Sequence, residues 1–264
     1  MPSSQDQTST NTLPESFVQE VRQAEAVADG AKLILLGLEV KGAPWEADAV
    51  ALIAEAQQAI PPVDSWAERV MLFTGHRVDS ANRKTPRFPA SKEEVAREAI
   101  RGAIKDQLGK SSNDKMLGVA GGANGGDLLF LEACDDLRIP TEMLITLPQE
   151  QFVKESVDNE NKTWTERFYA QVGKHSEIPV LATSTELPPW LAFKSGYDIW
   201  QRNNFWLLSA ALSYHAQFFT VIALWDGQAG DAPGGTEHMV EMAKERGATV
   251  IHLQTKDIFG LKSQ

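Results

Sequence analysis

Residues 115–127 read KMLGVAGGANGGD, and this stretch decides the fold class. The apolar run 115–120 is typical of a buried strand, and the four glycines of 121–126 indicate a turn that opens a helix over 126–137. The same order occurs twice more. RVMLFT at 69–74 precedes a Gly-His-Arg turn, and FFTVIALW at 218–225 precedes a glycine-rich loop and a helix over 236–246.

Further strands and helices are predicted between and after these units. We expect strands at 141–147, 178–181 and 249–253, a helix at 197–214, and two short helices within 149–172. A helix over 91–108 begins with Ser91 as N-cap and Glu94 three residues later, which is a capping box. Strands that alternate with helices indicate a parallel sheet covered on both faces. The sequence therefore predicts an α/β fold, a doubly wound, mostly parallel, Rossmann-like domain over residues 69–254.

The rest of the chain is expected to flank that domain. Residues 1–14 are polar and are predicted to be a disordered tail. Apolar residues recur at helical spacing over 15–62, which favours an N-terminal helical hairpin that ends at Pro61-Pro62. Residues 255–264 are expected to form a C-terminal tail.

The composition is that of an ordinary globular protein, with 42% hydrophobic and 23% charged residues in 264. No apolar run approaches the roughly 18–20 residues of a membrane span, and the first residues lack the pattern of a signal peptide. A single cysteine, Cys134, excludes an internal disulfide, and the five histidines lack metal-binding spacing. We therefore expect a cytoplasmic protein with no membrane partner, no metal and no cofactor.

The net charge of −11 is unevenly distributed. Residues 1–68 hold 3 basic and 11 acidic residues, whereas residues 76–110 hold 9 basic and 5 acidic residues. A strongly acidic chain is unsuited to nucleic-acid polymers, because their affinity comes mainly from Lys and Arg on phosphates. The local balance still permits a small anion. Arg97, Arg101 and Lys105 form one stripe, which predicts either a solvated face or a partner for the acidic hairpin.

Parallel sheets of this kind bind ligands at the carboxyl ends of their strands, where two features follow the first two strands. Gly75 permits a sharp turn, and Arg77 is suited to an anion. In 121–126 the missing β-carbons let backbone N–H groups approach a ligand, and the following helix N-terminus favours a phosphate. The loop matches neither GxGxxG nor a Walker A motif. Asp127 is expected either to cap the helix or to accept a ribose hydroxyl.

Two further features are predicted at the same edge. Arg202 and Asn203, at a helix start, suit an anion and a base or sugar edge. Asp226 ends a strand, and Gly234-Gly235-Thr236 opens the next helix with backbone N–H groups and a hydroxyl. Two such loops facing each other would hold one phosphorylated ligand from two sides.

Together the segments FTGHR, VAGGANGGD, RNN and ALWDG with PGGTEHMVEMA resemble the SLOG superfamily of Rossmann-like nucleotide-binding proteins. That superfamily includes the Lonely-Guy phosphoribohydrolases and the DNA-processing protein A fold, and the resemblance covers about residues 69–254. It implies nucleotide binding. The PGGxGTxxE pattern of the Lonely-Guy enzymes is absent, since Pro233-Gly234-Gly235 runs directly into Thr236 and residue 239 is Met. Glu237 and Glu241 are acids at other spacings.

We therefore expect the chain to bind a nucleotide or nucleotide-derived small molecule, as a sensor or regulatory domain. The alternative is an N-glycosidase, a phosphoribohydrolase that releases a base from a nucleoside monophosphate, with Glu237 and Glu241 as candidate catalytic residues. His76 and His238 are either acid/base groups or base contacts. Turnover, ligand identity, homo-oligomer formation and the role of the hairpin stay open. The expected ligand- or phosphate-binding residues are Gly75, His76, Arg77, Gly121, Gly122, Asn124, Gly125, Gly126, Asp127, Arg202, Asn203, Asp226, Gly234, Gly235 and Thr236.

Overall fold

The computed structural model describes residues 12–61, 65–158, 162–230 and 234–261. The chain divides into two compact units. One contains the N-terminal residues up to Pro62 together with Leu187–Ser195, and the other contains Val63–Glu186 and Gly196–Gln264.

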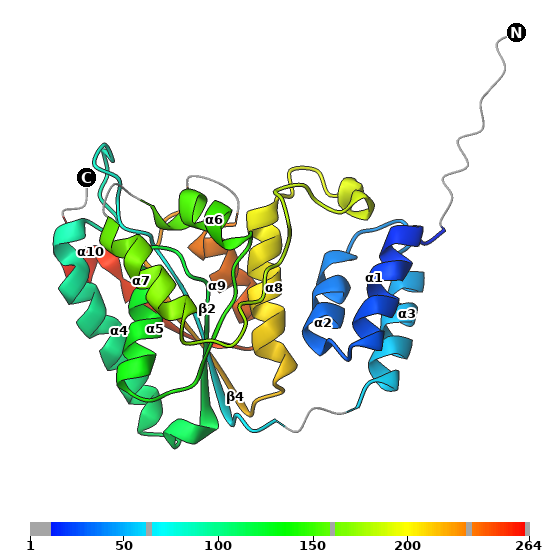
Figure 1. Cartoon of the computed structure of the whole chain (residues 1–264), viewed down its shortest axis with the longest axis horizontal. Helices are drawn as coiled ribbons and strands as arrows, with labels where there is room; N and C mark the ends of the chain where they lie inside the picture. Colours follow the sequence, from blue (N-terminus) through cyan, green and yellow to red (C-terminus); the bar gives the residue numbers. More distant parts are fainter. Residues whose placement is uncertain (1–11, 62–64, 159–161, 231–233, 262–264) are drawn as a thin grey trace, which may run out of the picture. The chain divides into compact units, whose positions relative to one another are not determined.

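The larger unit is built on a five-stranded sheet (Figure 1). Its strands are β1 (Arg69–Gly75), β2 (Met116–Ala120), β3 (Thr141–Met143), β4 (Phe218–Trp225) and β5 (Thr249–Gln254). They lie in the order β3-β2-β1-β4-β5, and every adjacent pair is parallel. The expected α/β, Rossmann-like fold is thus confirmed. Because the chain leaves β1 toward β2 and returns later to β4 on the other side, the order reverses between β1 and β4.

Helices cover both faces of this sheet (Figure 1). On one face α4 (Glu93–Leu108) packs beside α5 (Gly126–Asp136), and α7 (Lys162–Val172) lies against α5. On the other face α8 (Ile199–Ser213) packs beside α9 (Thr236–Glu245). The central strands are buried on both sides, which explains their continuous apolar sequences.

Three predicted elements of this unit differ in the structure, namely the helix over 91–108 and the strands over 141–147 and 178–181. Residues Ala90–Lys92 form a 3-10 turn, in which Lys92 N–H donates to the Pro89 carbonyl at 2.9 Å, and α4 begins at Glu93. Ser91 therefore lies inside a turn and caps no helix, so the predicted capping box is wrong. The strand expected over 141–147 ends at Met143. Beyond it, Ile145 and Val180 form one isolated bridge.

The chain after β5 also departs from the expected tail. Thr255–Phe259 form α10, whose first turn is capped by the Gln254 side chain. The buried ring of Phe259 stacks on Phe88 with a centroid separation of 5.3 Å. An aromatic anchor explains why this segment packs on the core. Next to α6 (Gln149–Phe152), Val153–Val157 form a π-helical turn.

The smaller unit holds three helices where the sequence predicts a hairpin. They are α1 (Glu15–Ala26), α2 (Gly30–Glu39) and α3 (Glu46–Ala59). The apolar run after Asp29 is a helix of its own, because the Asp29 side chain accepts the Lys32 N–H at 2.8 Å and caps it. The 3-10 turn Pro189–Phe193 completes this unit.

Aromatic rings form the centre of the smaller unit. Phe17 lies 5.0 Å from Trp45 and 5.1 Å from Trp190, measured between ring centroids. The Trp190 Nε1–H donates to Glu20 at 2.7 Å, and Glu20 also pairs with Lys32 at 2.7 Å. The segment 187–195, which the sequence assigns to the Rossmann-like domain, is therefore anchored among the N-terminal helices by Trp190.

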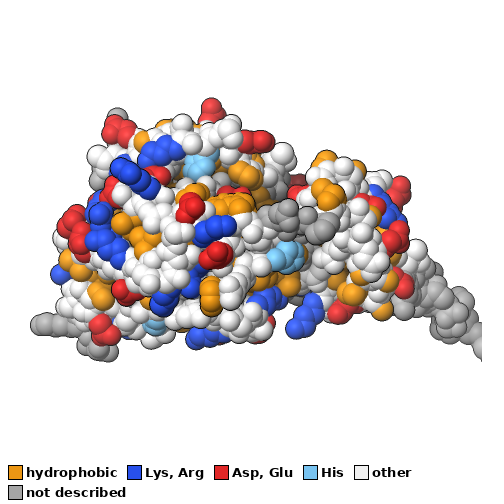
Figure 2. All heavy atoms as spheres, turned by 90° about the horizontal axis from the view of Figure 1, so that it is seen from below, with side chains coloured by type: hydrophobic (Ala, Val, Ile, Leu, Met, Phe, Trp, Pro, Cys, Tyr) orange, Lys and Arg blue, Asp and Glu red, His pale blue; other side chains and the backbone are white. Residues whose placement is uncertain are grey.

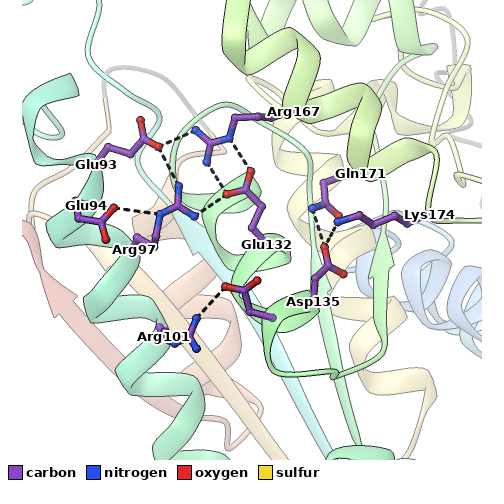
Figure 3. Close-up of polar contacts among 10 residues, drawn as sticks. Glu93, Glu94, Arg97, Arg101, Glu132, Asp135, Arg167, Gln171 and Lys174 are labelled. Atoms are coloured by element: carbon purple, nitrogen blue, oxygen red, sulfur yellow. Dashed lines mark hydrogen bonds and ion pairs between the residues drawn. The ribbon is translucent and has the colours of Figure 1, made fainter.

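Two residues of the basic stripe of α4, Arg97 and Arg101, pair with acidic residues of the same unit (Figure 3). Arg97 contacts Glu132 of α5 at 2.8 Å, and Arg101 contacts Asp136 at 2.8 Å. From α7, Arg167 donates to both oxygens of Glu132 at 2.6 Å. These contacts join α4, α5 and α7, so neither Arg97 nor Arg101 depends on the N-terminal helices for a partner.

Charged side chains of both signs share the face drawn in Figure 2, where the described residues form no continuous basic surface. Within the part of the chain that the structure describes, no helix combines the length and apolar character needed to cross a membrane. The described residues also contain no group of three or more His, Cys, Asp or Glu side chains arranged to hold a metal ion.

Candidate ligand-binding site

The point where the strand order reverses is occupied by a buried histidine and a buried aspartate. His76 follows β1 and Asp226 follows β4, and the His76 N–H donates to the Leu224 carbonyl at 2.9 Å. The imidazole Nε2 lies 3.0 Å from Asp226 Oδ1 and 3.1 Å from the Asp226 amide nitrogen. Two predicted site residues, 150 positions apart, are thus brought together between the two central strands.

The loop that contains Asp79 and Arg87 lies next to this pair, although neither residue is predicted to be in the site. Arg87 Nε lies 3.8 Å from Asp226 Oδ2. Asp79 Oδ2 accepts the N–H groups of Arg87 and Phe88, both at 2.9 Å, and thereby fixes the turn that carries Arg87. Burial lowers the pKa of His76, Asp226 opposes that change, and Arg87 adds to it. Arg87 is not among the predicted site residues. The excess of basic residues over 76–110 is the feature of the sequence that could have pointed to it.

The first glycine-rich turn is fastened to the loop after β1. The Asn124 side chain accepts the Val78 N–H at 3.0 Å and donates to the Val157 carbonyl at 2.9 Å. The Gly126 N–H donates to the His76 carbonyl at 3.2 Å. Asn124 is buried, so its amide group organises the turn.

The β-carbon positions of these glycines are filled by protein atoms. A β-carbon on Gly125, whose φ is +84°, would lie 2.7 Å from the Val78 amide nitrogen. One on Gly126 would lie 2.8 Å from the Phe73 ring, and one on Gly122 would collide with Met143. Gly125 meets backbone atoms, so packing within the chain requires glycine there, whereas the atom met at Gly122 is the end of a flexible side chain.

Asp127, in the first turn of α5, folds its side chain back over the glycine turn. Its Oδ2 accepts the Ala123 N–H at 3.3 Å and lies 2.6 Å from where a β-carbon on Gly121 would be. Burial of the carboxyl group raises the pKa of Asp127 to about 7, against the opposing effects of the Ala123 N–H and Arg77. Its charge is therefore sensitive to pH near neutrality.

Arg77 is exposed and reaches the π-helical turn, where it donates to the Glu155 carbonyl at 2.8 Å. The next two carbonyls of that turn accept hydrogen bonds from Asn124. The Asn124 backbone N–H donates to the Ser156 carbonyl at 3.0 Å, and the Asn124 side chain donates to the Val157 carbonyl. The last carbonyls of a helix have no partner within it, so those of residues 155–157 are available to other loops. The π-helical turn thus contacts both the loop after β1, through Arg77, and the glycine-rich turn before α5, through Asn124.

The second group of predicted residues lies where α8 and α9 begin. α8 starts with a capping box between Asp198 and Gln201. A β-carbon on Gly234, whose φ is +78°, would lie 2.6 Å from the Trp200 carbonyl carbon. Asn204 donates to the Gly234 carbonyl at 2.8 Å and contacts the Gly235 carbonyl at 3.2 Å.

Asn204, which is not among the predicted site residues, is therefore the residue that holds the second turn. It was visible as the second asparagine of RNN. Arg202 is buried and has a partner, while the Oδ1 atom of Asn203 is enclosed and has no hydrogen-bond partner among the described residues.

The two candidate catalytic acids, Glu237 and Glu241, follow the buried Thr236 on α9. Glu237 is half-buried in the first turn, whereas Glu241 is exposed one turn further along. His238 lies between them, 3.2 Å from the Asn204 side chain, and burial lowers its pKa.

No protein-family model matches the sequence, and no curated protein matches it. Among solved structures, DNA processing protein A from Streptococcus pneumoniae is similar, with 13% sequence identity and a TM-score of 0.34. The alignment covers 96% of this chain and 95% of that chain. A likeness at this level carries no argument, so the Rossmann-like assignment stands on the strand order and the helices.

Proposed function

We propose that the carboxyl edge of the sheet binds a nucleotide or nucleotide-derived small molecule. The carrying observation is that two glycine-rich strand-to-helix turns follow β2 and β4, the strands on either side of β1, at the carboxyl edge where the strand order reverses. Ligands of doubly wound sheets bind outside the carboxyl ends of the strands, at such a reversal. First-turn N–H groups have no acceptor within their own helix and favour phosphate, and in α5 the Gly126 N–H is already used by the His76 carbonyl.

Side chains around these turns supply further contacts for such a ligand. Arg77 is exposed and held by a single backbone carbonyl, so its guanidinium can turn toward a phosphate. The enclosed Oδ1 atom of Asn203 is suited to accept a hydrogen bond from a ribose hydroxyl or a base amine. Asp127 is a second acceptor beside the first turn.

A sensor role is supported by the path of the chain. Residues 187–195 are anchored in the N-terminal unit through Trp190, and three residues after Ser195 the chain reaches Asp198, the cap of α8. The connection is therefore short, and we infer that a shift in the first turn of α8 acts on Pro189–Phe193 along it.

The test is a thermal-shift panel of AMP, NAD, ADP-ribose and cyclic nucleotides with the full chain. At a concentration of 100 times Kd a ligand adds about 2.7 kcal/mol, or roughly 5–10 °C in Tm. We expect Arg77→Ala to reduce the shift, and Arg101→Ala, which removes only a surface pair with Asp136, to retain it. Hydrogen exchange should then change at Pro189–Phe193 when ligand is added.

Absence of any shift with every phosphorylated ligand would contradict nucleotide binding. A shift without a change in exchange at Pro189–Phe193 would contradict only the sensor role. The two parts of the proposal are thus separated by one set of samples.

A further inference from the structure

The His76–Asp226 pair has a geometry that phosphate binding does not require. A loop that only cradles a phosphate needs backbone N–H groups and a cation. Here a nearly enclosed imidazole, 9% exposed, is joined to a carboxylate that is 3% exposed. The pair lies where a bound ligand would meet β1 and β4.

The contacts of Nε2 decide which ring nitrogen carries the proton. A proton on Nε2 makes a charge-assisted hydrogen bond to Asp226 Oδ1 at 3.0 Å, which is about twice as strong as a neutral one. Without that proton, the Nε2 lone pair would accept the Asp226 N–H at 3.1 Å but would face the carboxylate oxygen. With the proton, that N–H gives up this acceptor, and the charge-assisted bond to the carboxylate is the stronger of the two. Arg87 Nε, 3.8 Å from Asp226 Oδ2, places a cation on the far side of this carboxylate.

The other ring nitrogen, Nδ1, is left available. None of the described residues hydrogen-bonds it, and it is absent from the fully enclosed polar atoms that lack a partner. Nδ1 is thus not fully enclosed, in a residue that is 9% exposed overall. A histidine with one nitrogen held by a carboxylate and the other accessible and unprotonated is arranged to accept a proton.

We propose that His76 is the proton acceptor of a hydrolytic site and that Asp226 is its positioning residue. This rests on the proposed binding of a nucleotide. Water adds its oxygen to an electrophilic centre of the nucleotide, either the sugar carbon C1′ or a phosphorus, and gives its proton to Nδ1. The bond to the leaving group breaks, the electron pair departs with that group, and the group takes the proton from the imidazolium. One water molecule is consumed and no electrons are transferred to another reagent.

Proton transfer of this kind depends on pH in a defined direction. His76 must be neutral to accept a proton, so turnover falls as the pH drops through its pKa. That pKa lies below the ordinary value because the ring is buried. The charged groups that face the ring are Asp226, Asp79 and Arg87, and Arg77 is its neighbour in the chain.

The experiment uses the full chain, His76→Gln and His175→Gln with AMP, NAD, ADP-ribose and a cyclic nucleotide. The glutamine side chain of the His76→Gln variant keeps an amide N–H for Asp226 and lacks the basic nitrogen, so folding and ligand-induced thermal shifts should persist. Liquid chromatography and phosphorus NMR distinguish a released base, which reports attack at C1′, from a released phosphate or opened ester. General base catalysis typically contributes about 10²–10⁴-fold, and we expect His76→Gln to lose that factor.

The matched control should behave like the unmodified protein, because His175 lies beyond the end of α7, outside the proposed site. Asp226→Asn should lower the rate and move the acidic limb of the pH profile, which a merely structural role would not do. Nitrogen-15 NMR of the histidine rings should show the proton of neutral His76 on Nε2.

Three results would overturn the inference. They are ligand binding with no product from the unmodified protein, equal turnover by His76→Gln, and a proton on Nδ1 in the neutral ring. If no ligand binds at all, the proposed function itself fails, and the thermal-shift data show that separately.

Discussion

The glycine-rich turns before α5 and α9 share a sequence pattern but are held by different kinds of contact. The first is fastened by Asn124, which lies within the turn and bonds outward to two other loops. The second is fastened by Asn204, which lies on α8 and bonds inward to the turn. The first turn thus organises its surroundings, whereas the second is organised by a neighbouring helix. This difference makes the second turn the one that responds to movement of α8.

The largest effect expected from this comparison is at Gly125. Gly125→Ala places a β-carbon against the Val78 nitrogen in a left-handed conformation, and we expect a loss of roughly 4 kcal/mol in the free energy of unfolding. Gly247→Ala is the control, because Gly247 has a φ of +75° with nothing within 4 Å. It should lose about 1 kcal/mol. Equal losses in urea unfolding would show that strain, and not the close approach, governs the first turn.

The two asparagines give the next largest difference. Asn124→Ala leaves a buried N–H and a buried carbonyl without partners, so we expect a loss of about 2–3 kcal/mol. Asn204→Ala removes the contacts to the Gly234 and Gly235 carbonyls of the second turn. We expect it to lower the free energy of unfolding by about 1 kcal/mol. Urea unfolding measures both. If Asn204→Ala were the more costly change, the roles assigned to the two turns would be reversed.

The smallest effect is a difference in pH dependence. Asp127 accompanies the first turn, and its folded-state pKa of about 7 lies above the ordinary value of 3.8. The folded state therefore binds the proton more tightly, and stability should fall as the pH rises from about 4 to about 7. Asp127→Asn should flatten this decline, with a change on the order of 1 kcal/mol given the partial exposure of the residue. Stability curves that stay parallel across this range would contradict the assignment.

Strand and helix positions are readable from the sequence because burial on both faces makes them nearly continuous apolar runs. RVMLFT and FFTVIALW form β1 and β4 with at most one residue of difference. The short segment 144–147 is equally apolar. Its Leu144 N–H donates to Ala120, the last residue of β2, at 3.0 Å, and beyond that point no β2 residue is left to pair with, so Ile145 forms an isolated bridge with Val180. Apolar character alone does not show where a partner strand ends.

The site is only partly readable, because its contacts join residues far apart in the chain. His76 and Asp226 are both predicted at the carboxyl edge, yet nothing in a linear pattern indicates that their side chains meet. The glycines suggest room for a ligand, whereas the β-carbon positions of Gly122, Gly125 and Gly126 are taken by other parts of the chain. Asn204 is not predicted because it is the same residue type as its neighbour Asn203. Only the helix shows which of the two side chains points toward the second turn.

The composition of the smaller unit sets an order for its assembly on the ribosome. Trp190 is synthesised about 130 residues after α3 ends, an interval of roughly 6–25 s at 5–20 residues per second. Throughout that interval the rings of Phe17 and Trp45 lack the indole that packs against them in the finished protein. The first helices to be made are therefore among the last to be completed, because their aromatic centre lacks one ring until Trp190 has been synthesised.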